Sequence, residues 1–389
     1  METHTRLSMT GGIALKRWEI SSLQAAMLVA GVVALTGHAL AVSHFMQAGG
    51  RDAWLSGLFA LPAALLAIWA FDRLGRLYPG MTVVQYAPKV LGYAGYPVAV
   101  LYGIYYFIVV VFTVRMTTDW MVDSILTETP SWIMGLLYMA AVFYAAVNGL
   151  DVLARVNQFI LPLLTFLGFV VSFGTIPAKD YSLLLPMFEK GPLPVFVASL
   201  MATGYYGETS VVAMMGAYVA RKDRPRLLKA NAFALLFIVT TLTGPLAGSA
   251  ATLGYRVAQN MPYPTFQHWL MLSFARFFER TDLLAVHQWL AGAYVRCGLF
   301  LLLSVDVFLT LTGKRETKPF RWSMVVVGLL TVMAAEWAFP SKPAFDIFVN
   351  RVYFPAGAVL GILMPVIMVA VAWARGLGKP GAMGSSHGS

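Results

Sequence analysis

The 389-residue chain is 59% hydrophobic and only 12% charged, which excludes an ordinary soluble protein, because soluble domains carry about 25% charged residues. Its net charge of +10 does not point to nucleic acid, because the Lys and Arg residues stand in short connections between apolar segments. The single cysteine, Cys297, excludes an intrachain disulfide framework and a cysteine-based metal cluster. The composition therefore indicates a polytopic membrane protein embedded in the lipid bilayer.

The apolar segments predict one all-α membrane domain over residues 18–375. Because a spanning helix needs about 20 residues, we expect about ten transmembrane helices. In chain order they are Ile20–Met46, Ala53–Arg73, Tyr96–Ile125, Ser131–Leu150, Val156–Phe173, Leu193–Val219, Leu227–Leu253, Leu283–Thr312, Trp322–Phe339 and Phe345–Trp373. We expect residues 1–17 to form a cytoplasmic tail and the Gly/Ser-rich residues 376–389 to be disordered.

The basic residues predict the orientation of these helices. They precede the first predicted helix and then follow the second, fourth, sixth and eighth. The residues are Arg6, Lys16, Arg17, Arg73, Arg76, Lys89, Arg155, Arg221, Lys222, Arg224, Arg226, Lys229, Lys314, Arg315, Lys318 and Arg321. Because cytoplasmic connections are rich in Lys and Arg, every second connection is expected in the cytoplasm. An even number of helices then places both termini there.

The sixth predicted helix contains residues that a simple spanning helix avoids. Near the middle of Ser199–Gly216 stand Thr203, Gly204, Tyr205, Tyr206, Gly207 and Glu208. Gly weakens a helix by about 1 kcal/mol relative to Ala, and a charge at bilayer depth costs at least about 2.5 kcal/mol. Irregular backbone persists at this depth only where it lines a cavity or is buried in protein. We therefore predict a discontinuous helix with its break at a ligand site.

The first predicted helix has a similar weak point at Thr36, Gly37 and His38. As at Thr203-Gly204-Tyr205, a Thr-Gly pair is followed by a polar ring. Each of these helices opens one half of a ten-helix chain, and five is an odd number, so the second half runs inverted relative to the first. Interrupted helices at matching positions of two inverted five-helix repeats are typical of a transporter-type site near the midplane.

The two predicted breaks suit a zwitterionic ligand such as an amino acid. Unpaired N–H groups at the start of the outer half of the first helix favour an anionic group. Free carbonyls at the break in the sixth helix can accept hydrogen bonds from an ammonium. Tyr102 and Tyr106 share one face of the third helix, so they either line this site or pack with their hydroxyls bonded to neighbouring groups.

Glu208 and Arg296 are the charged residues nearest the middle of their predicted helices. Intramembrane carboxylates face a cavity or pair with a cation, and an arginine, which is always charged, needs an acceptor. Glu208 is therefore either a proton or cation site, with a pKa that desolvation raises, or the structural partner of Arg296. Asp306 is the second candidate partner for Arg296.

The chain carries no sequence signal for catalysis. We find no GxxxxGK[ST] motif, no Cys/His metal spacing, no nucleophile elbow and no soluble catalytic domain in the sequence. We therefore expect neither an enzyme nor a nucleotide-driven pump, and we expect no cofactor and no bound metal.

Several short motifs carry a resemblance to a known family. The most specific is Arg280-x-Asp282, followed by Trp289 seven residues later. The others are Gly49-Gly50-Arg51-Asp52-Ala53-Trp54, Leu77-Tyr78-Pro79-Gly80-Met81-Thr82, Leu91-Gly92, Tyr263-Pro264-Thr265 and Phe277-Phe278-Glu279. Through these motifs, and over nearly all ten predicted helices, the chain resembles the spore-germination permease family. Its members are the B subunits of nutrient germinant receptors, within the amino acid–polyamine–organocation superfamily.

The resemblance implies a leucine-transporter-like fold with a germinant bound among the first, third, sixth and eighth helices. It also implies assembly in the spore inner membrane with a larger A subunit and a lipoprotein C subunit. The family's binding residues carry over only where the breaks coincide, at Thr36, Gly37, Gly204 and Tyr205, and more loosely at Tyr102 or Tyr106.

Three functions are compatible with these observations. The first is a ligand-sensing receptor subunit that binds a small nutrient, such as an amino acid, and triggers germination. The second is an autonomous amino acid or amine transporter that is coupled to protons through Glu208. The third is an ion channel or a structural scaffold. Binding without uptake would favour the receptor, whereas uptake by the isolated protein would favour the transporter.

Overall fold

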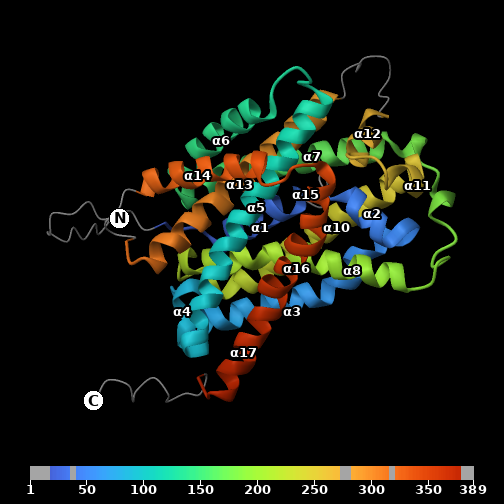
Figure 1. Ribbon diagram of the computed structural model, residues 1–389. Coiled ribbons are helices and arrows are strands. Elements are labelled where there is room, and N and C mark those ends of the chain that lie inside the picture. Colours follow the sequence, from blue (N-terminus) through green and yellow to red (C-terminus); the bar gives the residue numbers. More distant parts are fainter. Residues whose placement is uncertain (1–17, 36–40, 272–281, 315–319, 378–389) are drawn as a thin grey trace, which may run out of the picture.

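The structure is a computed structural model that describes residues 18–35, 41–271, 282–314 and 320–377. Within these ranges the regular structure is helical, and the extended pairing consists of one isolated bridge between Ile20 and Val219. Figure 1 shows the helices gathered into one bundle. The predicted all-α fold is confirmed.

The described chain contains seven helical stretches that are long and apolar enough to cross a membrane. They are Val42–Leu77, Val83–Ser124, Leu150–Gly174, Arg224–Leu253, Leu283–Leu311, Phe320–Trp337 and Lys342–Ala374. Two shorter apolar helices accompany them, Ser22–Ala34 and Ser131–Val147. These stretches support a multi-pass membrane protein, and the total of ten spans stays a prediction.

The α-helices follow one another along the whole described chain. They are α1 (Ser22–Leu35), α2 (Val42–Gly49), α3 (Ser56–Leu77), α4 (Val83–Leu91), α5 (Gly95–Ser124), α6 (Ser131–Val147), α7 (Leu150–Gly174), α8 (Leu193–Tyr206), α9 (Val211–Met215), α10 (Leu227–Leu253), α11 (Tyr255–Ala258), α12 (Pro264–Leu270), α13 (Asp282–Leu311), α14 (Phe320–Trp337), α15 (Lys342–Phe348), α16 (Phe354–Gly357) and α17 (Met364–Ala374). The last span, α15 to α17, also contains two π-helical turns, Val349–Tyr353 and Ala358–Leu363.

The first predicted helix is divided between α1 and α2. α1 ends at Leu35 and α2 begins at Val42, while Thr36, Gly37 and His38 lie outside the described residues. α2 then continues through a 3-10 turn, Gly50–Leu55, into α3. The predicted boundary between the first two spans is therefore a 3-10 turn.

The sixth predicted helix changes its winding at Gly207–Ser210, where a 3-10 turn joins α8 to α9. This turn begins at the second glycine of the stretch from Thr203 to Glu208, where the sequence predicts the break. Gly204 lies inside α8. Because it has no side chain, α8 can pack closely against the last span at this position. A Cβ atom on Gly204 would overlap the carbonyl oxygen of Phe354, and one on Gly207 would overlap that of Gly357. The two backbones therefore meet directly.

The connections gather at two opposite ends of the bundle. At one end, Trp18 packs edge-on against Tyr218 and Phe320, with ring centroids 5.2 and 5.5 Å apart. These contacts bring together Trp18, the end of the sixth predicted span and the start of α14. The predicted basic connections lie next to these residues, and we call this end of the bundle the basic end. At the opposite end, Lys342 Nζ lies 2.5 Å from Oδ2 of Asp123. The alternation of the connections between the two ends, and the cytoplasmic side, stay predictions.

Burial differs sharply between the spans. In the most apolar part of α13, 78% of the residues are buried, compared with 11% in α7. Phe159, Phe166 and Phe173 on α7 are all exposed, as expected for a helix that faces lipid rather than protein. α13 instead packs among other helices, so any charged group on it must find partners inside the protein.

Candidate functional site

Arg296 on α13 has an acceptor for each of its five N–H donors. Nε donates to Oγ1 of Thr113 at 2.7 Å. Nη1 donates to the backbone oxygen of Val32 at 2.6 Å and to Oε2 of Glu208. Nη2 donates to Oε1 of Glu208 and to the hydroxyl oxygen of Tyr353, both at 2.9 Å. The guanidinium is fully buried, and this complete set of partners is what makes a buried charge tolerable.

Glu208 lies in the 3-10 turn that joins α8 to α9. Its two carboxylate oxygens face the two Nη atoms of Arg296, and the Tyr353 hydroxyl donates to Oε1. The Glu208–Arg296 pair predicted from the sequence is therefore present. Asp306, the second predicted partner of Arg296, instead accepts a hydrogen bond from the Tyr218 hydroxyl at 2.7 Å.

This group, which we call the five-helix cluster, joins five separate spans. Its members are Val32 on α1, Thr113 on α5, Glu208 after α8, Arg296 on α13 and Tyr353 in the first π-helical turn of the last span. Val32 lies in the last turn of α1, where carbonyl oxygens have no partner within the helix and positive charge is favoured. Arg296 therefore caps α1 and holds it against the other four spans.

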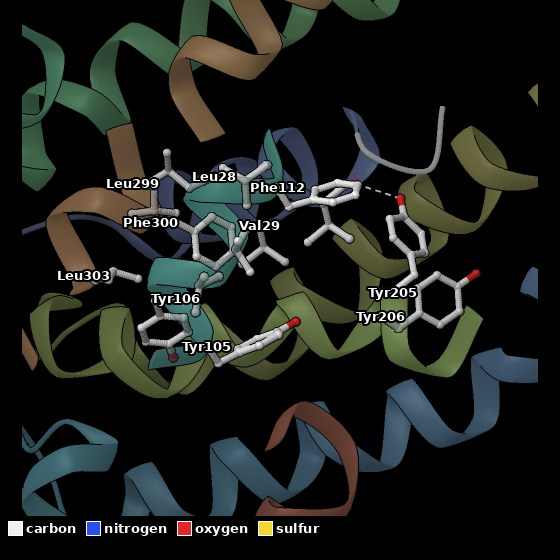
Figure 2. Close-up of a cluster of buried hydrophobic side chains, with 14 of the residues drawn as sticks. Leu28, Val29, Tyr105, Tyr106, Phe112, Tyr205, Tyr206, Leu299, Phe300 and Leu303 are labelled. Atoms are coloured by element: carbon white, nitrogen blue, oxygen red, sulfur yellow. Dashed lines mark hydrogen bonds between the residues drawn. The ribbon is translucent and has the colours of Figure 1, made fainter. Parts of the chain in front are cut away.

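Three tyrosine hydroxyls satisfy carbonyl oxygens at the irregular parts of these helices. The acceptors lie in the last turn of α1, in the 3-10 turn after α8 and in the second π-helical turn of the last span. The three hydrogen bonds run from Tyr205 to Val33 at 2.8 Å, from Tyr106 to Ser210 at 3.0 Å and from Tyr102 to Leu360 at 2.6 Å. Figure 2 shows the bond of Tyr205 as a dashed line. The hydroxyls thus replace hydrogen bonds that regular helices would make internally.

Tyr105 differs from its neighbour Tyr106. Figure 2 shows their two rings pointing in different directions from α5. The Tyr105 hydroxyl is buried and has no hydrogen-bond partner among the described residues. It lies close enough to Gly357 that a Cβ atom there would be 2.9 Å away. Tyr105 therefore brings an unused donor and acceptor into the crossing between α5 and the last span.

The predicted site residues fall into three groups. Tyr102, Tyr106, Tyr205, Glu208 and Arg296 lie in the buried interior where these helices cross. Thr203 and Gly204 do not join the five-helix cluster: the Thr203 hydroxyl donates to Ser199 O within α8 at 2.9 Å, and Gly204 packs against Phe354. Thr36, Gly37 and His38 lie outside the described residues. A role in ligand binding stays a prediction for every one of these residues.

Thr113, Tyr353 and Tyr105 also lie in the buried interior, but the sequence did not point to them. Thr113 gives no signal of its own, because Thr is common in membrane helices. Tyr353 stands in a stretch that reads as an uninterrupted apolar span, although Pro355 two residues later is a helix-breaking residue. That proline was the available sign of irregular winding in the last span.

A cavity of about 150 Å³ lies at the end opposite the basic end. It is lined by α2, α5, α15 and residues 259–263, and we call it the α2–α15 cavity. Its charged or polar side chains include Ser43, His44, Asp119, Lys342 and Asp346. α2 begins beside it at Val42 without a side-chain cap among the described residues. This cavity therefore combines open volume with charged and polar side chains in its lining.

A second cavity, of about 90 Å³, lies at the basic end. Asp72, Arg76 and Arg224 line it, and Arg76 Nε donates to Oδ2 of Asp72 at 2.6 Å. No group of three or more His, Cys, Asp or Glu side chains suited to a metal occurs among the described residues.

Comparisons with known proteins agree with this geometry. The family model described as "Spore germination protein" matches residues 19–340. Spore germination protein XB of Bacillus anthracis is 26% identical over 363 residues, which cover 91% of this chain and 98% of that protein. The crystal structure of MhsT in complex with L-phenylalanine matches with a TM-score of 0.68 at 15% identity, over 93% of this chain and 91% of that chain.

A nucleobase-cation-symport-1 family transporter in a closed conformation, with bromovinylhydantoin bound, matches with a TM-score of 0.57 at 13% identity, over 95% of this chain and 97% of that chain. At such identities the two structures establish the fold alone, which is the transporter-like fold that the sequence predicts. The family model covers most of the chain, so the resemblance found in the sequence motifs is confirmed. The chain belongs to the spore germination permease family.

Proposed function

We propose that the chain is the membrane subunit of a nutrient germinant receptor in the spore inner membrane, and that it binds an amino acid within its transporter-like fold. The family match over residues 19–340 is the observation that carries this proposal. The fold likeness to MhsT in complex with L-phenylalanine supports an amino acid as the ligand class.

The five-helix cluster supports a mechanism for the response. A movement of α1 relative to α13 must break the bond between Arg296 and Val32, and a movement of the turn after α8 must break the pair with Glu208. Because a separated buried ion pair is strongly unfavourable, the cluster favours two discrete helix arrangements over a continuous range. In this proposal the ligand shifts the balance between the two arrangements.

The output of such a shift is proposed to be a contact with other subunits. The family resemblance suggests a larger A subunit and a lipoprotein C subunit as partners, and both termini of this chain are proposed to lie in the cytoplasm. The proposed ligand contacts are those at the two helix breaks and on the neighbouring face of α5: Thr36, Gly37, His38, Thr203, Gly204, Tyr205, Glu208, Arg296, Tyr102 and Tyr106.

The experiment that tests this proposal is ligand-induced thermal stabilisation of the detergent-purified protein across the amino acids. A ligand present at 100 times its Kd stabilises the folded state by about 2.7 kcal/mol, which a melting curve detects. We expect at least one amino acid to raise the melting temperature, and the same amino acid to trigger germination of spores that carry the receptor. If no amino acid stabilises the protein, the proposed ligand class is wrong.

The second candidate is an autonomous amino acid or amine transporter, which the transporter neighbours favour. Its proposed proton site, Glu208, is engaged by both Nη atoms of Arg296 and by Tyr353, and these contacts favour a structural ion pair over a free proton carrier. Uptake of a radiolabelled amino acid into liposomes that contain only this chain would establish the transporter. Binding without uptake supports the receptor.

A further inference from the structure

We propose that the α2–α15 cavity receives the ammonium group of a small ligand, such as a small amino acid or amine. This inference rests on the proposed function and adds to it a recognition site that is separate from the proposed contacts at the helix breaks. The α2–α15 cavity offers about 150 Å³ of open volume.

The charges around the cavity favour a cation. Arg115 Nε donates to Oδ2 of Asp119 at 2.8 Å, and Lys342 Nζ lies 2.5 Å from Oδ2 of Asp123. Asp346 has His44 as its ion-pair contact among the described residues. Arg115 and Lys342 are thus engaged by Asp119 and Asp123, and Asp346 is the carboxylate without an Arg or Lys partner within the described chain. A ligand ammonium would supply such a partner.

His44 is the second and independent observation. Its side chain lines the cavity and is only 6% exposed. Nε2 lies 3.3 Å from Oδ1 of Asp346, yet neither ring nitrogen makes a hydrogen bond with any described residue. A buried polar group without a hydrogen bond is unfavourable by about 1–3 kcal/mol, so a polar ligand that donates to or accepts from this ring would be favoured.

Two aromatic rings at the cavity lie against cations of the chain itself. Lys342 Nζ lies 5.8 Å from the centroid of the Tyr263 ring, and the Arg115 guanidinium carbon lies 5.9 Å from that of Phe345. Both rings line the cavity, and ring faces attract cations. Burial raises the pKa of Tyr263, so its hydroxyl stays protonated and donates to Oδ2 of Asp123 at 3.2 Å.

The size of the cavity limits the ligand. An apolar protein cavity of about 150 Å³ binds benzene, a molecule of six heavy atoms. The α2–α15 cavity has the same volume, which matches an amine or amino acid of about six heavy atoms.

A continuous set of contacts connects this cavity to the five-helix cluster. Phe345 at the cavity stacks on Phe112, with ring centroids 5.9 Å apart, and Phe112 stacks on Tyr353 at 4.2 Å. Tyr353 in turn donates to Glu208. A ligand that displaces Phe345 therefore acts on a ring stack that ends at the buried ion pair.

The test is a melting-temperature titration of the purified full chain with ethylammonium, L-alanine and propionate. Ethylammonium carries only the positive group and propionate only the negative one, while L-alanine carries both. We expect the two ammonium compounds to stabilise the protein and propionate not to do so. We expect Asp346→Asn to weaken the apparent affinity for both at least tenfold, and Glu128→Gln, a change at an exposed carboxylate outside the cavity, to leave it unchanged.

A second measurement covers the case in which Asp346→Asn fails to fold. Gln47 lines the cavity and is exposed, so a maleimide should label Gln47→Cys, while the native Cys297 is buried. Ethylammonium should slow labelling of Gln47→Cys and leave labelling of Lys190→Cys, which lies outside the cavity, unchanged.

The outcomes separate this inference from the proposed function. One outcome is that an amino acid stabilises the protein, although Asp346→Asn does not weaken its binding and it does not slow the labelling of Gln47→Cys. That result would mean that the ligand binds elsewhere, and it would overturn the inference while the proposed function stands. Equal stabilisation by propionate would overturn the recognition of ammonium. If none of the amino acids stabilises the wild-type chain, both the inference and the proposed ligand class are wrong.

Discussion

Glu208 and Arg296 neutralise each other at a point where neither side chain is exposed. Glu208→Gln would leave the guanidinium without a counter-charge, and breaking a buried pair costs about 3–5 kcal/mol. We therefore expect Glu208→Gln and Arg296→Gln each to lower the melting temperature strongly, and the double variant Glu208→Gln/Arg296→Met to regain part of the loss.

The same substitution decides between the two sequence-based interpretations of Glu208. If Glu208 were protonated, Gln would resemble its native state. The Glu208→Gln protein would then keep its fold and abundance but lose its response to the ligand. A melting temperature of Glu208→Gln equal to that of the exposed control Glu128→Gln would therefore contradict the structural ion pair.

Tyr105 and Tyr106 offer a matched pair of hydroxyl deletions on one helix. Tyr106→Phe removes the donor to Ser210 O and should destabilise the protein by about 1 kcal/mol, because it leaves a buried carbonyl unsatisfied. Tyr105→Phe removes a hydroxyl that has no partner among the described residues and should be neutral or stabilising. Chemical or thermal unfolding of the two variants tests this, and an equal loss in both would show that Tyr105 also has a partner.

At the level of whole helices, the closest contact is the crossing between α8 and the last span. A Cβ atom on Gly204 would overlap backbone atoms of Phe354 that cannot rotate away, and such overpacking typically costs about 1–3 kcal/mol. We expect Gly204→Ala to lower the melting temperature. Gly244→Ala in α10 is the control, because no described atom lies within 4 Å of its added Cβ and Ala favours a helix by about 1 kcal/mol.

This crossing changes how a Gly204 variant must be interpreted. If Gly204→Ala kept its melting temperature but lost ligand binding, the residue would face a ligand as the sequence analysis predicted. If it lost both together, the packing role would account for the effect.

For the molecule as a whole, the testable feature is the alternation of connections between two ends. The native Cys297 is buried, so an introduced surface cysteine reports its own accessibility. Lys222→Cys, exposed at the basic end, and Lys190→Cys, exposed at the other end, should be labelled from opposite sides of sealed inside-out and right-side-out vesicles. With Lys and Arg favoured in the cytoplasm, Lys222→Cys should react in inside-out vesicles, and labelling of both from one side would refute the topology.

Much of the architecture followed from the chain alone. Apolar length predicted most spans within a few residues, because a bilayer imposes a minimum helix length. The pairing of Glu208 with Arg296 was predictable for a related reason: a charge inside the membrane must be compensated, and few opposite charges stand at the same depth. The break in the sixth helix was predicted between Thr203 and Glu208, and the structure puts the change of winding at Gly207. Gly204 and Gly207 look alike in sequence, and only the neighbouring backbone distinguishes them.

The sequence by itself thus determined the class of protein, the family and the charged pair at its centre. These properties depend on composition, periodicity and the cost of burying charge, which are local or additive. The tertiary structure alone decided that Thr113 and Tyr353 complete the partners of Arg296, that tyrosine hydroxyls cap the irregular turns, and that His44 and Asp346 meet at one cavity. Those facts depend on which faces of distant helices come together, and the chain carries no local record of such contacts.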